Sequence, residues 1–572
     1  MIKARVQAEK SDANLKSYSE TYKTFRWADV EPEFSWHATG KLNIVHEAVD
    51  RWTEDPEKAD RTALIYEKAG QVQAFTYREL MKKSCQWADL LTEYGYQTGD
   101  RLHIILSPRP ELYFAVLACA RLGVIVSPLF PTLTFGELRD VLTNSEARGI
   151  LTHPDMVERL PPDAMKSVKN IFLLEGPLSG LFEQEMILGD LPSKMPEEFQ
   201  TRWVSAETPL YLLYSSGSTG PPKGVVHSHG DMSGHLITGR YVLDLREGTV
   251  LWTDGHPGWV TGTVYSIFTP LLCGAITVIQ GAPFSASTWY RTLEQHRVEV
   301  WYTTPRTIRR LIEAGDDLPG RYDCSALRHI CTVGETLPPE LFYWVRKNMK
   351  LSPHDTWWMT ETGMICIANY PSMDIKPGSM GKPFPGVEAA VVDENGEPLD
   401  MLTMGELALR PGWPAMMKEI RLDEARYAEY FRHEGWLLTG DMVIQDEDGY
   451  FYHQGRTDDL MKAGEKLVGP YEIEQLLAGH PEVKEAAVIS KEGITGQPLL
   501  KAFVLLQPSA YASSRLIQEL RSYVRANLSA DITLNEIAFV EELPKTPSGK
   551  LLRRVLRAGE LGLPGGDFLR LK

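Results

Sequence analysis

The chain has 572 residues, of which 43% are hydrophobic and 24% charged, and these proportions are typical of a globular protein. Its length exceeds what one hydrophobic core usually supports, so two or more domains are expected. The formal net charge of −16 argues against a nucleic-acid partner and against an anionic membrane surface, since both usually meet a basic face.

Helices and strands are predicted to alternate from about residue 40 onwards. Thr76 and Glu79 have the spacing of a capping box, which marks the start of one helix. The alternation predicts an α/β fold with mostly parallel sheets flanked by helices, in which ligands meet the carboxyl ends of strands. The predicted helices span residues 43–52, 80–91 and 111–122, and the predicted strands span 62–66, 101–106, 124–128, 210–214, 277–280, 298–302 and 330–333.

A second, smaller unit is predicted to begin near Asp458. Just before it, the acidic run ending in Gly449 predicts a hairpin turn within residues 445–452. We therefore expect a large N-terminal domain, residues 1–457, and a small mobile α+β domain, residues 458–572. In the small domain the predicted helices span 471–477 and 515–527, and the predicted strands span 486–490 and 501–506.

The cysteine pattern and the N-terminal residues give an expectation for the cellular compartment. Six cysteines are scattered without a Cys-x-x-Cys pair, so neither a zinc site nor a disulfide framework is expected. The first residues lack the apolar core of a signal peptide, and no apolar run is long enough to predict a membrane span. The expected location is the cytoplasm.

The segment 214–224, Tyr-Ser-Ser-Gly-Ser-Thr-Gly-Pro-Pro-Lys-Gly, directly follows a predicted strand. Its glycines allow the backbone to approach a ligand, and its N–H groups and hydroxyls are donors for anionic oxygens. Lys223 adds a charge suited to phosphate, so the segment predicts a polyphosphate-binding loop. It is not a Walker P-loop, because Gly220 is followed by two prolines. The alternative is a flexible linker.

Four further segments carry side chains suited to binding a nucleotide, through its phosphates, its ribose or its Mg²⁺ ion. Segment 355–363 offers two tryptophan walls and a glutamate suited to Mg²⁺, and Thr439-Gly440-Asp441 places a carboxylate after an expected strand end, where it could bind ribose. Segment 455–460 has an arginine for phosphate or ribose oxygens, and segment 544–554 has a lysine after a Ser-Gly turn. Taken singly, each also fits a structural role: core tryptophans, a plain turn, a surface salt bridge or a basic loop.

In this order the five segments resemble the adenylate-forming superfamily, which includes acyl-CoA synthetases, peptide-synthetase adenylation domains and luciferases. The resemblance runs from about residue 18 to residue 564. Segments 34–43 and 258–262 are similar to those of the AMP-forming acetyl-CoA synthetases, in their shorter bacterial form.

The resemblance implies two half-reactions. A carboxylate attacks the α-phosphate of ATP to give an acyl adenylate and diphosphate, and the thiol of coenzyme A then displaces AMP. ATP, Mg²⁺ and coenzyme A are the expected cofactors, and the expected substrate is a small carboxylate, acetate first and propionate second. Three alternatives stay open: another thiol acceptor such as a carrier protein, a non-catalytic binding protein on the same scaffold, and the reverse reaction, which makes ATP.

The resemblance also assigns roles to residues. Lys550, Thr360 and Glu361 are expected to be catalytic, with Glu361 also holding the metal ion. Asp458 is the expected hinge of the small domain, and Arg525 an expected contact for coenzyme A. The expected ATP and AMP contacts are Ser216, Gly217, Ser218, Thr219, Gly220, Lys223, Gly334, Glu335, Thr336, Asp355, Thr356, Trp357, Asp441, Arg456 and Lys466, and the expected acyl pocket consists of Val260, Thr261, Val333 and Trp358.

Trp358 matches the tryptophan that closes the pocket floor in acetyl-CoA synthetases, where relatives with larger substrates typically have glycine. An indole fills space that extra methylenes need. One methylene is worth only about 1–3 kcal/mol in such a pocket, so propionate is the expected competitor.

Two departures from the family pattern concern the position of a family arginine and His256. Without a gap, Leu467 faces that arginine, and with a one-residue shift Lys466 does. Close relatives often have aspartate at position 256, so His256 is either a group that titrates near neutral pH or a neutral neighbour. Regulation by modification of Lys550 is a further expectation, and the oligomeric state is open.

Overall fold

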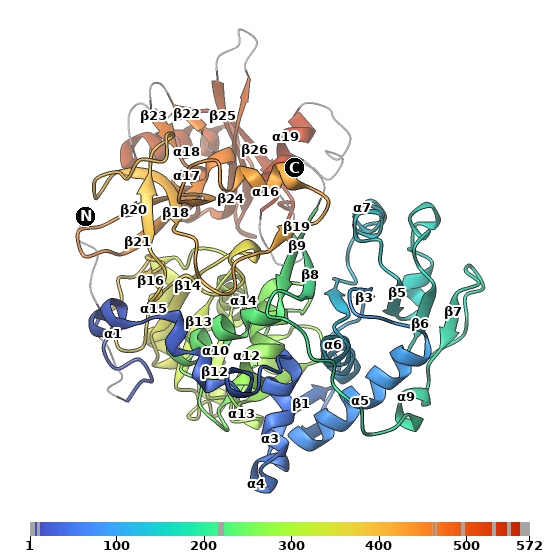
Figure 1. Ribbon diagram of the computed structural model, residues 1–572. Coiled ribbons are helices and arrows are strands. Elements are labelled where there is room, and N and C mark those ends of the chain that lie inside the picture. Colours follow the sequence, from blue (N-terminus) through green and yellow to red (C-terminus); the bar gives the residue numbers. More distant parts are fainter. Residues whose placement is uncertain are drawn as a thin grey trace. The chain divides into compact units, whose positions relative to one another are not determined.

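The computed structural model describes residues 6–7, 12–215, 222–459, 461–463, 466–492, 498–528, 533–545 and 551–560 (Figure 1). Contacts between residues divide the chain into two compact units. Unit 1 comprises Met1–Gly217, Pro221–Glu388 and Pro411–Glu429, and unit 2 comprises Ser218–Gly220, Ala389–Arg410 and Tyr430–Lys572. This division by contacts differs from the predicted boundary at residue 458. That residues 458–572 move as one domain remains a prediction.

The first sheet of unit 1 orders its strands β16-β15-β14-β13-β12-β10-β11-β1-β2. Pairing is parallel from β14 to β1 and antiparallel at both ends of the sheet. The strands are β1 (Thr62–Lys68), β2 (Gln71–Thr76), β10 (Val250–Thr253), β11 (Ile276–Gln280), β12 (Val300–Thr303), β13 (His329–Thr332), β14 (Pro353–Trp357), β15 (Ile367–Ala368) and β16 (Lys382–Pro383).

The second sheet of unit 1 has the order β19-β9-β8-β4-β3-β5-β6-β7. It is parallel from β8 to β7, while β9 and β19 run antiparallel to their neighbours. The predicted α/β class with mostly parallel sheets is therefore confirmed. The strands are β3 (Arg101–Ile104), β4 (Ile125–Pro128), β5 (Gly149–Thr152), β6 (Asn170–Leu173), β7 (Glu185–Ile187), β8 (Pro209–Ser215), β9 (Lys223–Ser228) and β19 (Glu419–Ile420).

Helices of unit 1 connect the strands. The capping box predicted at Thr76 and Glu79 is present at the start of α5 and satisfies two N–H groups that the helix itself leaves without partners. The helices are α1 (Tyr18–Thr24), α2 (Ser35–Thr39), α3 (Arg51–Thr53), α4 (Pro56–Ala59), α5 (Tyr77–Glu93), α6 (Pro110–Leu122), α7 (Phe135–Ser145), α8 (Pro154–Val157), α9 (Leu191–Lys194), α10 (Met232–Tyr241), α11 (Val260–Gly262), α12 (Thr269–Leu272), α13 (Ala286–Gln295), α14 (Pro305–Ala314), α15 (Pro339–Met349) and α16 (Glu424–Glu429).

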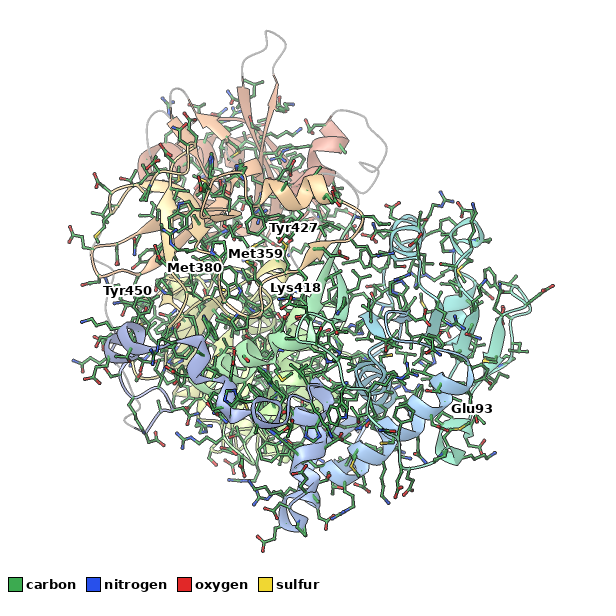
Figure 2. All side chains as sticks on the ribbon, viewed as in Figure 1. Glu93, Met359, Met380, Lys418, Tyr427 and Tyr450 are labelled. Atoms are coloured by element: carbon green, nitrogen blue, oxygen red, sulfur yellow. The ribbon has the colours of Figure 1, made fainter. Side chains whose placement is uncertain are left out.

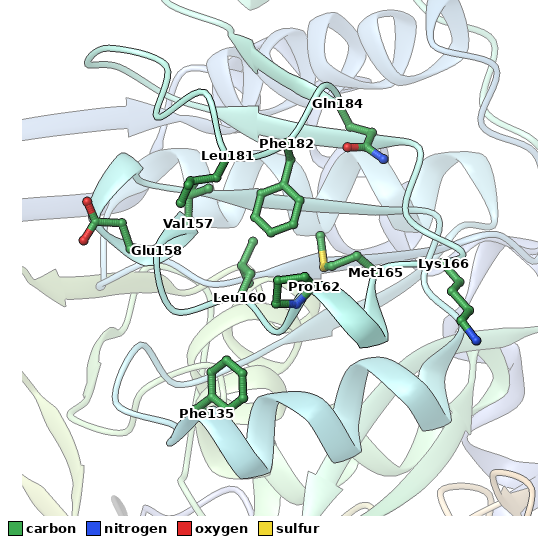
Figure 3. Close-up of a pocket in the computed structure, with 10 residues that line it drawn as sticks. All are labelled: Phe135, Val157, Glu158, Leu160, Pro162, Met165, Lys166, Leu181, Phe182 and Gln184. Carbon is green, nitrogen blue, oxygen red and sulfur yellow. The ribbon is translucent and has the colours of Figure 1, made fainter.

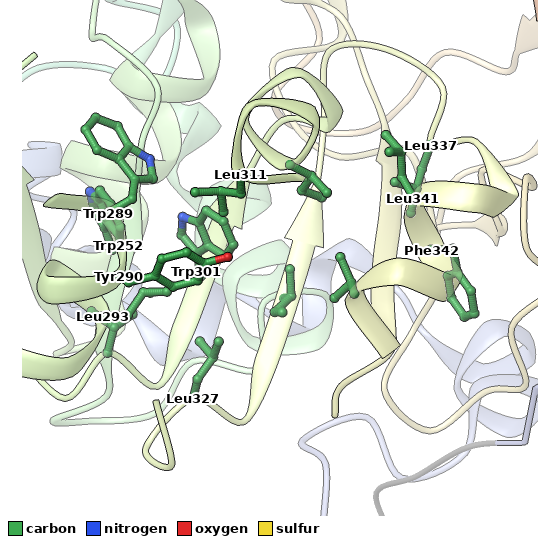
Figure 4. Close-up of a cluster of buried hydrophobic side chains, with 14 of the residues drawn as sticks. Trp252, Trp289, Tyr290, Leu293, Trp301, Leu311, Leu327, Leu337, Leu341 and Phe342 are labelled. Atoms are coloured by element: carbon green, nitrogen blue, oxygen red, sulfur yellow. The ribbon is translucent and has the colours of Figure 1, made fainter. Parts of the chain in front are cut away.

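A cluster of large aromatic side chains fills the core between the first sheet and helices α13, α14 and α15 (Figure 4). Trp252 of β10 and Trp301 of β12 stack with ring centroids 6.1 Å apart, and Trp289 of α13 meets Trp252 at 5.3 Å. Each such side chain buries roughly 150–250 Å². The cluster therefore fixes the neighbouring strands β10, β12 and β13, whose carboxyl ends lead into predicted site residues.

Unit 2 contains three smaller sheets, ordered β17-β18-β20-β21, β22-β23 and β24-β25-β26. Its apolar core packs α17 and α18 against β24 and β25, and these four elements are ones that the sequence predicted. The strands are β17 (Ala389–Val392), β18 (Met404–Leu409), β20 (Leu437–Gln445), β21 (Phe451–Arg456), β22 (Met461–Ala463), β23 (Lys466–Val468), β24 (Val483–Glu492), β25 (Pro498–Leu506) and β26 (Leu534–Val540), and the helices are α17 (Pro470–Ala478), α18 (Ser514–Asn527) and α19 (Arg553–Glu560). All helices that the structure describes are too short or too polar to span a membrane.

Among the wholly buried histidines of unit 1, three have a lowered pKa that predicts acid sensitivity. Burial lowers the pKa of His103 and of His235 to about 4, and that of His229 to about 3. In the unfolded chain each ring binds a proton near pH 6.5, so unfolding takes up protons below that pH. We expect the free energy of unfolding to fall as the pH drops from 6.5 towards 4, by roughly 1.4 kcal/mol per pH unit for each histidine.

Calorimetry in buffers of different ionisation enthalpy would count those protons. The expected uptake attributable to these rings near pH 5 approaches three, and the triple variant with His103, His229 and His235 each replaced by Gln should lose it. An unchanged proton uptake in that variant would show that the three rings are already charged in the folded chain.

Candidate functional site

The turn formed by η8 (Thr360–Thr362) and Gly363 is the centre of the site. Gly363 has a φ of +66°, and a Cβ atom there would lie 2.1 Å from the carbonyl oxygen of Ala415, so only glycine fits. Backbone N–H of Met417 donates to the carbonyl of Glu361 at 2.9 Å, and the indole of Trp413 donates to that of Thr362 at 2.8 Å. Segment 413–417 therefore fixes the turn from outside.

Lys223, the first residue of β9, makes an ion pair with Glu361 in this turn. The two side chains are only 10% and 3% exposed, and a pair shielded in this way is screened little by solvent. An ammonium group suits phosphate oxygens, and a carboxylate suits Mg²⁺. The structure thus brings two of the predicted residues together beside Thr360. Predicted residues Ser216, Gly217, Ser218, Thr219 and Gly220 lie outside the described residues.

A divalent ion fits this donor set as a partner of the substrate. Mg²⁺ is usually bound by one or two carboxylates together with substrate phosphates and water. Glu361 supplies one buried carboxylate. Within the described ranges, no group of three or more His, Cys, Asp or Glu side chains forms a metal site, and an ion that arrives with a nucleotide needs none.

Asp355, in the middle of β14, organises the predicted base-binding segments. Its carboxyl oxygens accept from the Thr332 hydroxyl at 2.7 Å and from the backbone N–H of Leu337 at 3.3 Å, and burial raises its pKa to about 7. The side chain therefore anchors the loop that contains Gly334, Glu335 and Thr336. The loop is also fixed on its outer side, where Arg309 donates to both carboxylate oxygens of Glu335 at 2.9 and 2.8 Å.

Trp358 is held by hydrogen bonding and by ring packing. Its indole N–H donates to the hydroxyl of Tyr302 at 3.1 Å, and that hydroxyl lies 2.8 Å from Oγ1 of Thr356. The ring of Tyr265 meets the indole edge-on, with centroids 5.0 Å apart. Trp357 and Trp358 are each only 8% exposed. Sequence reasoning missed Tyr265 and Tyr302, because nothing near them in the chain marks them as neighbours of Trp358.

The other predicted pocket residues, Val260, Thr261 and Val333, are all buried. A Cβ atom on Gly334 would lie 3.0 Å from the ring of Trp259, so the segment before Val260 packs against the segment after Val333. The hydroxyl of Thr261 is buried and has no hydrogen-bond partner among the residues that the structure describes. Such a hydroxyl suits a polar ligand atom, since a buried polar group without a partner is costly.

His256 is neutral at physiological pH, because burial lowers its pKa to about 4. Its Nε2–H donates to the carbonyl of Leu106 at 2.9 Å, while Nδ1 accepts from the backbone N–H of Gly258 at 2.8 Å. Of the two predicted alternatives, the neutral one fits these contacts. The ring joins the end of β3 to the segment that leads into α11.

Asp441 and Arg456 lie opposite each other on paired strands of unit 2, where Arg456 donates to Asp441 at 2.7 Å. The expectation that Asp441 follows a strand end was wrong, because the residue lies inside β20. Gly440 (φ +74°) and the register shift that follows it allow β20 to continue past the Thr-Gly-Asp sequence. A Cβ atom at Gly440 would lie 2.7 Å from the guanidinium group, so the glycine makes room for Arg456.

Of the predicted residues of unit 2, Asp458 and Lys466 are described only in part, Arg525 is described in full, and Lys550 is not described. Asp458 lies in η9 (Thr457–Asp459) and Lys466 begins β23, but their side chains are outside the described part. Arg525 lies in the last turn of α18 with an exposed side chain. Lys550 lies outside the described residues.

A separate pocket of about 600 Å³ opens beside α7 and β7 in unit 1 (Figure 3). Its lining includes Phe135, Met165 and Phe182, and none of the predicted site residues belongs to that lining.

Figure 2 shows the side chains on the ribbon and labels Met359, the residue directly before the turn of residues 360–363.

Comparison with known proteins decides the family. A model of the AMP-binding enzyme family matches residues 51–419, and a model of the AMP-binding enzyme C-terminal domain matches residues 472–550. The chain belongs to the AMP-binding enzyme family. The predicted membership of the adenylate-forming superfamily is thereby confirmed.

Several known proteins are similar to this chain over nearly its whole length. Acetyl-coenzyme A synthetase of Bacillus subtilis (strain 168) is 44% identical over 563 residues, 98% of each chain. Acetyl-coenzyme A synthetase of Pasteurella multocida (strain Pm70) is 36% identical, covering 92% of this chain and 85% of the relative. Among solved structures, the anthranilate CoA ligase AuaEII in complex with anthranoyl-AMP has a TM-score of 0.81 at 27% identity, covering 93% of this chain and 98% of that one.

The contacts of Trp358 generate a prediction about substrate size. Tyr302→Phe removes the acceptor of the indole N–H, so Trp358 should gain freedom to turn aside. A hydrogen bond of about 0.5–1.5 kcal/mol corresponds to a rise of roughly 2- to 12-fold in kcat/KM for propionate relative to acetate.

Tyr77→Phe is the matched control, because the buried Tyr77 hydroxyl donates to a backbone carbonyl, that of Ala275, outside the set of predicted pocket residues. The account of the pocket is wrong if both variants leave the propionate-to-acetate ratio unchanged, or if both change it equally.

Proposed function

We propose that this chain is an AMP-forming acetate–CoA ligase, which converts acetate, ATP and coenzyme A into acetyl-CoA, AMP and diphosphate through acetyl adenylate. The whole-length similarity to acetyl-coenzyme A synthetases supports the reaction class. Acetate is the proposed substrate and propionate its nearest competitor.

The observation that carries the proposal is the short distance between Trp358, which limits the size of the acid, and Thr360, which contacts the phosphate. Trp358 precedes Thr360 by two residues, so their Cα atoms lie within about 7 Å. An acid whose carboxylate meets a phosphate at Thr360 therefore has little length available before its carbon chain reaches the indole. Because Trp358 is buried and fixed by Tyr302, a longer acid would have to displace a packed side chain.

In the first half-reaction, an acetate oxygen attacks the α-phosphorus of ATP, and the bond from that phosphorus to the bridging oxygen breaks to release diphosphate. Two anions must meet, so positioning and charge compensation dominate. Lys223 and residues 216–220 hold the outer phosphates, Thr360 contacts the α-phosphate, and Glu361 holds Mg²⁺. Bound Mg²⁺ supplies further compensation for the phosphate charge. Lys550 brings a cation to the reacting carboxylate.

In the second half-reaction, the thiol of coenzyme A gives up its proton to solvent and its sulfur attacks the acetyl carbon, so that the bond from this carbon to the phosphate oxygen breaks and AMP leaves. Asp441 and Arg456 hold the ribose, Gly334–Thr336 and Asp355–Trp357 the base, and Arg525 contacts coenzyme A. The small domain turns about Asp458 between the two steps, and Lys466 compensates for the family arginine. This gating motion is of a known type.

Regulation and location complete the proposal. Acylation of the Lys550 amine would remove its positive charge and so stop adenylate formation. We also propose a cytoplasmic location.

The proposed function is tested by measuring diphosphate and AMP release from the purified chain with acids of two to eight carbons. Acetate should release diphosphate without coenzyme A and release AMP when coenzyme A is added. Acetyl-CoA with AMP and diphosphate should give ATP in the reverse assay. If no acid supports diphosphate release, the chain is not an adenylating enzyme, and AMP release that needs a carrier protein instead of coenzyme A would change the acceptor.

Lys550→Ala should slow adenylate formation by about 10²- to 10³-fold, the usual cost of losing one group that stabilises transition-state charge. Thioester formation from supplied acetyl adenylate should stay largely intact. Lys545→Ala is the matched control, because Lys545 pairs with Glu485 at 2.7 Å within unit 2. Equal loss of both half-reactions in Lys550→Ala would refute the role assigned to Lys550.

Trp358→Gly should shift the preference towards longer acids, because removal of the indole opens the space that it fills. The acids of two to eight carbons again measure this, as kcat/KM for each acid. A profile that still peaks at acetate, in a variant with the parent melting temperature, would contradict the pocket argument.

A further inference from the structure

Each of the four consecutive backbone carbonyls from Thr360 to Gly363 accepts a hydrogen bond from a group outside the turn. Two of the donors, Met417 and Trp413, come from the segment that follows β18 in the chain. The other two are histidines: Nε2 of His227 lies 2.7 Å from the carbonyl oxygen of Thr360, and Nε2 of His235 lies 3.2 Å from that of Gly363. With its carbonyls engaged on one side, the turn cannot rotate its peptide planes without losing these bonds.

His227 and Lys223 act on the turn from one face of one strand. Alternate residues of a strand point to the same side, so Lys223, Val225 and His227 share a face of β9. Lys223 reaches the side chain of Glu361, and His227 reaches the backbone of Thr360. One strand face therefore contacts the side chain of Glu361 and the backbone of its neighbour Thr360.

The hydrogen-bond partners of His227 determine where protons lie around its ring. A carbonyl oxygen only accepts, so Nε2 must carry a proton to bond with Thr360. On the other side of the ring, Nδ1 lies 2.7 Å from Oδ2 of Asp231, so a second proton lies between these two atoms. The remaining oxygen of Asp231 accepts from the hydroxyl of Ser228 at 2.9 Å. The carboxylate thus fixes the orientation of the ring and leaves Nε2 as the donor.

Burial makes this arrangement rigid. The side chains of His227 and Asp231 are both 0% exposed, and the ring of Tyr211 stacks on the imidazole with centroids 4.9 Å apart. A Cβ atom on Gly363 would lie 2.5 Å from the imidazole, so the turn and the ring are in direct contact. Water cannot replace the Nε2–H donor here without a cavity being opened.

We propose that His227, oriented by Asp231, is a positioning residue for adenylate formation: its Nε2–H fixes the carbonyl oxygen of Thr360 and thereby aims the Thr360 hydroxyl and the Glu361 carboxylate at the nucleotide. The inference rests on the proposed function of the Thr360 turn. His227 touches no reacting atom and acts through the backbone of Thr360.

Two variants at position 227 separate the donor from the bulk of the ring. His227→Leu removes the donor, whereas the amide nitrogen of His227→Gln can occupy the position of Nε2 and donate to the same carbonyl. Because a misplacement of about 1 Å can cost about 100-fold, kcat for acetate-dependent ATP–diphosphate exchange should fall by about that factor in His227→Leu. It should return to within about tenfold of the parent value in His227→Gln.

The acyl pocket should not respond to these changes. KM for acetate and the ratio of propionate to acetate activity should stay within about twofold of the parent values, because Trp358 is fixed by other residues. His103→Leu is the matched control, since His103 is equally buried in the same sheet but bonds to Ser145. A loss in His103→Leu equal to that in His227→Leu, equal losses in the Leu and Gln variants at 227, or near-parent exchange in both would overturn the proposal.

A readout that does not depend on activity distinguishes this inference from the proposed function. In protein labelled with ¹⁵N at histidine, His227 should show a slowly exchanging Nε2 proton, assigned by its disappearance in His227→Gln. The Nδ1 resonance, at the atom that shares the second proton with Asp231, should shift in Asp231→Asn. If the parent protein activates no acid but shows the slowly exchanging Nε2 proton, the proposed function fails and the geometry of the dyad stands. If Nε2 carries no proton, or its proton exchanges rapidly, the dyad fails whatever the activity.

Discussion

The chemistry that we propose for this chain depends on one short turn, residues 360–363, being held in a fixed conformation. Thr360 and Glu361 can serve a phosphate group and its metal ion only if their side chains point the same way each time a nucleotide binds. Hydrogen bonds to the four carbonyls of the turn, together with the glycine at 363, meet that requirement. The donors come from distant parts of unit 1, so the fold as a whole, and not the local sequence, makes the turn rigid.

The proposed choice of substrate depends on the same short segment. The proposed wall of the acyl pocket and the proposed phosphate contact belong to one segment, in which Trp358 lies two residues before Thr360. Trp358 bonds to Tyr302, and Tyr302 to Thr356, so the proposed limit on the length of the acid is fixed at the same strand end as the turn. In this proposal, size selection and phosphate chemistry share one support, the carboxyl end of β14.

The sequence predicted the α/β class, the strands that lead into the site and the family, because these follow from local patterns and from the order of short motifs. It also predicted the residues that meet at the turn, Lys223, Thr360 and Glu361. It could not identify His227 or Tyr302, because their hydrogen-bond partners, Thr360 and Trp358, lie 133 and 56 residues away in the chain. No local sequence pattern predicts a buried hydrogen bond of this kind. Asp441 was misplaced because a glycine and a register shift, and not a strand end, shape that segment.

The most direct test of this account is a crystal structure of the chain with a non-reactive analogue of acetyl adenylate and, separately, with Mg²⁺ and an ATP analogue. The account predicts that the backbone of residues 360–363 keeps all four carbonyl contacts, with the α-phosphate at Thr360 and the acetyl group against Trp358. With Mg²⁺ and the ATP analogue, Lys223 and Glu361 should separate to meet phosphate and metal. A nucleotide bound away from this turn, or a turn that refolds and loses the contact with His227, would contradict it.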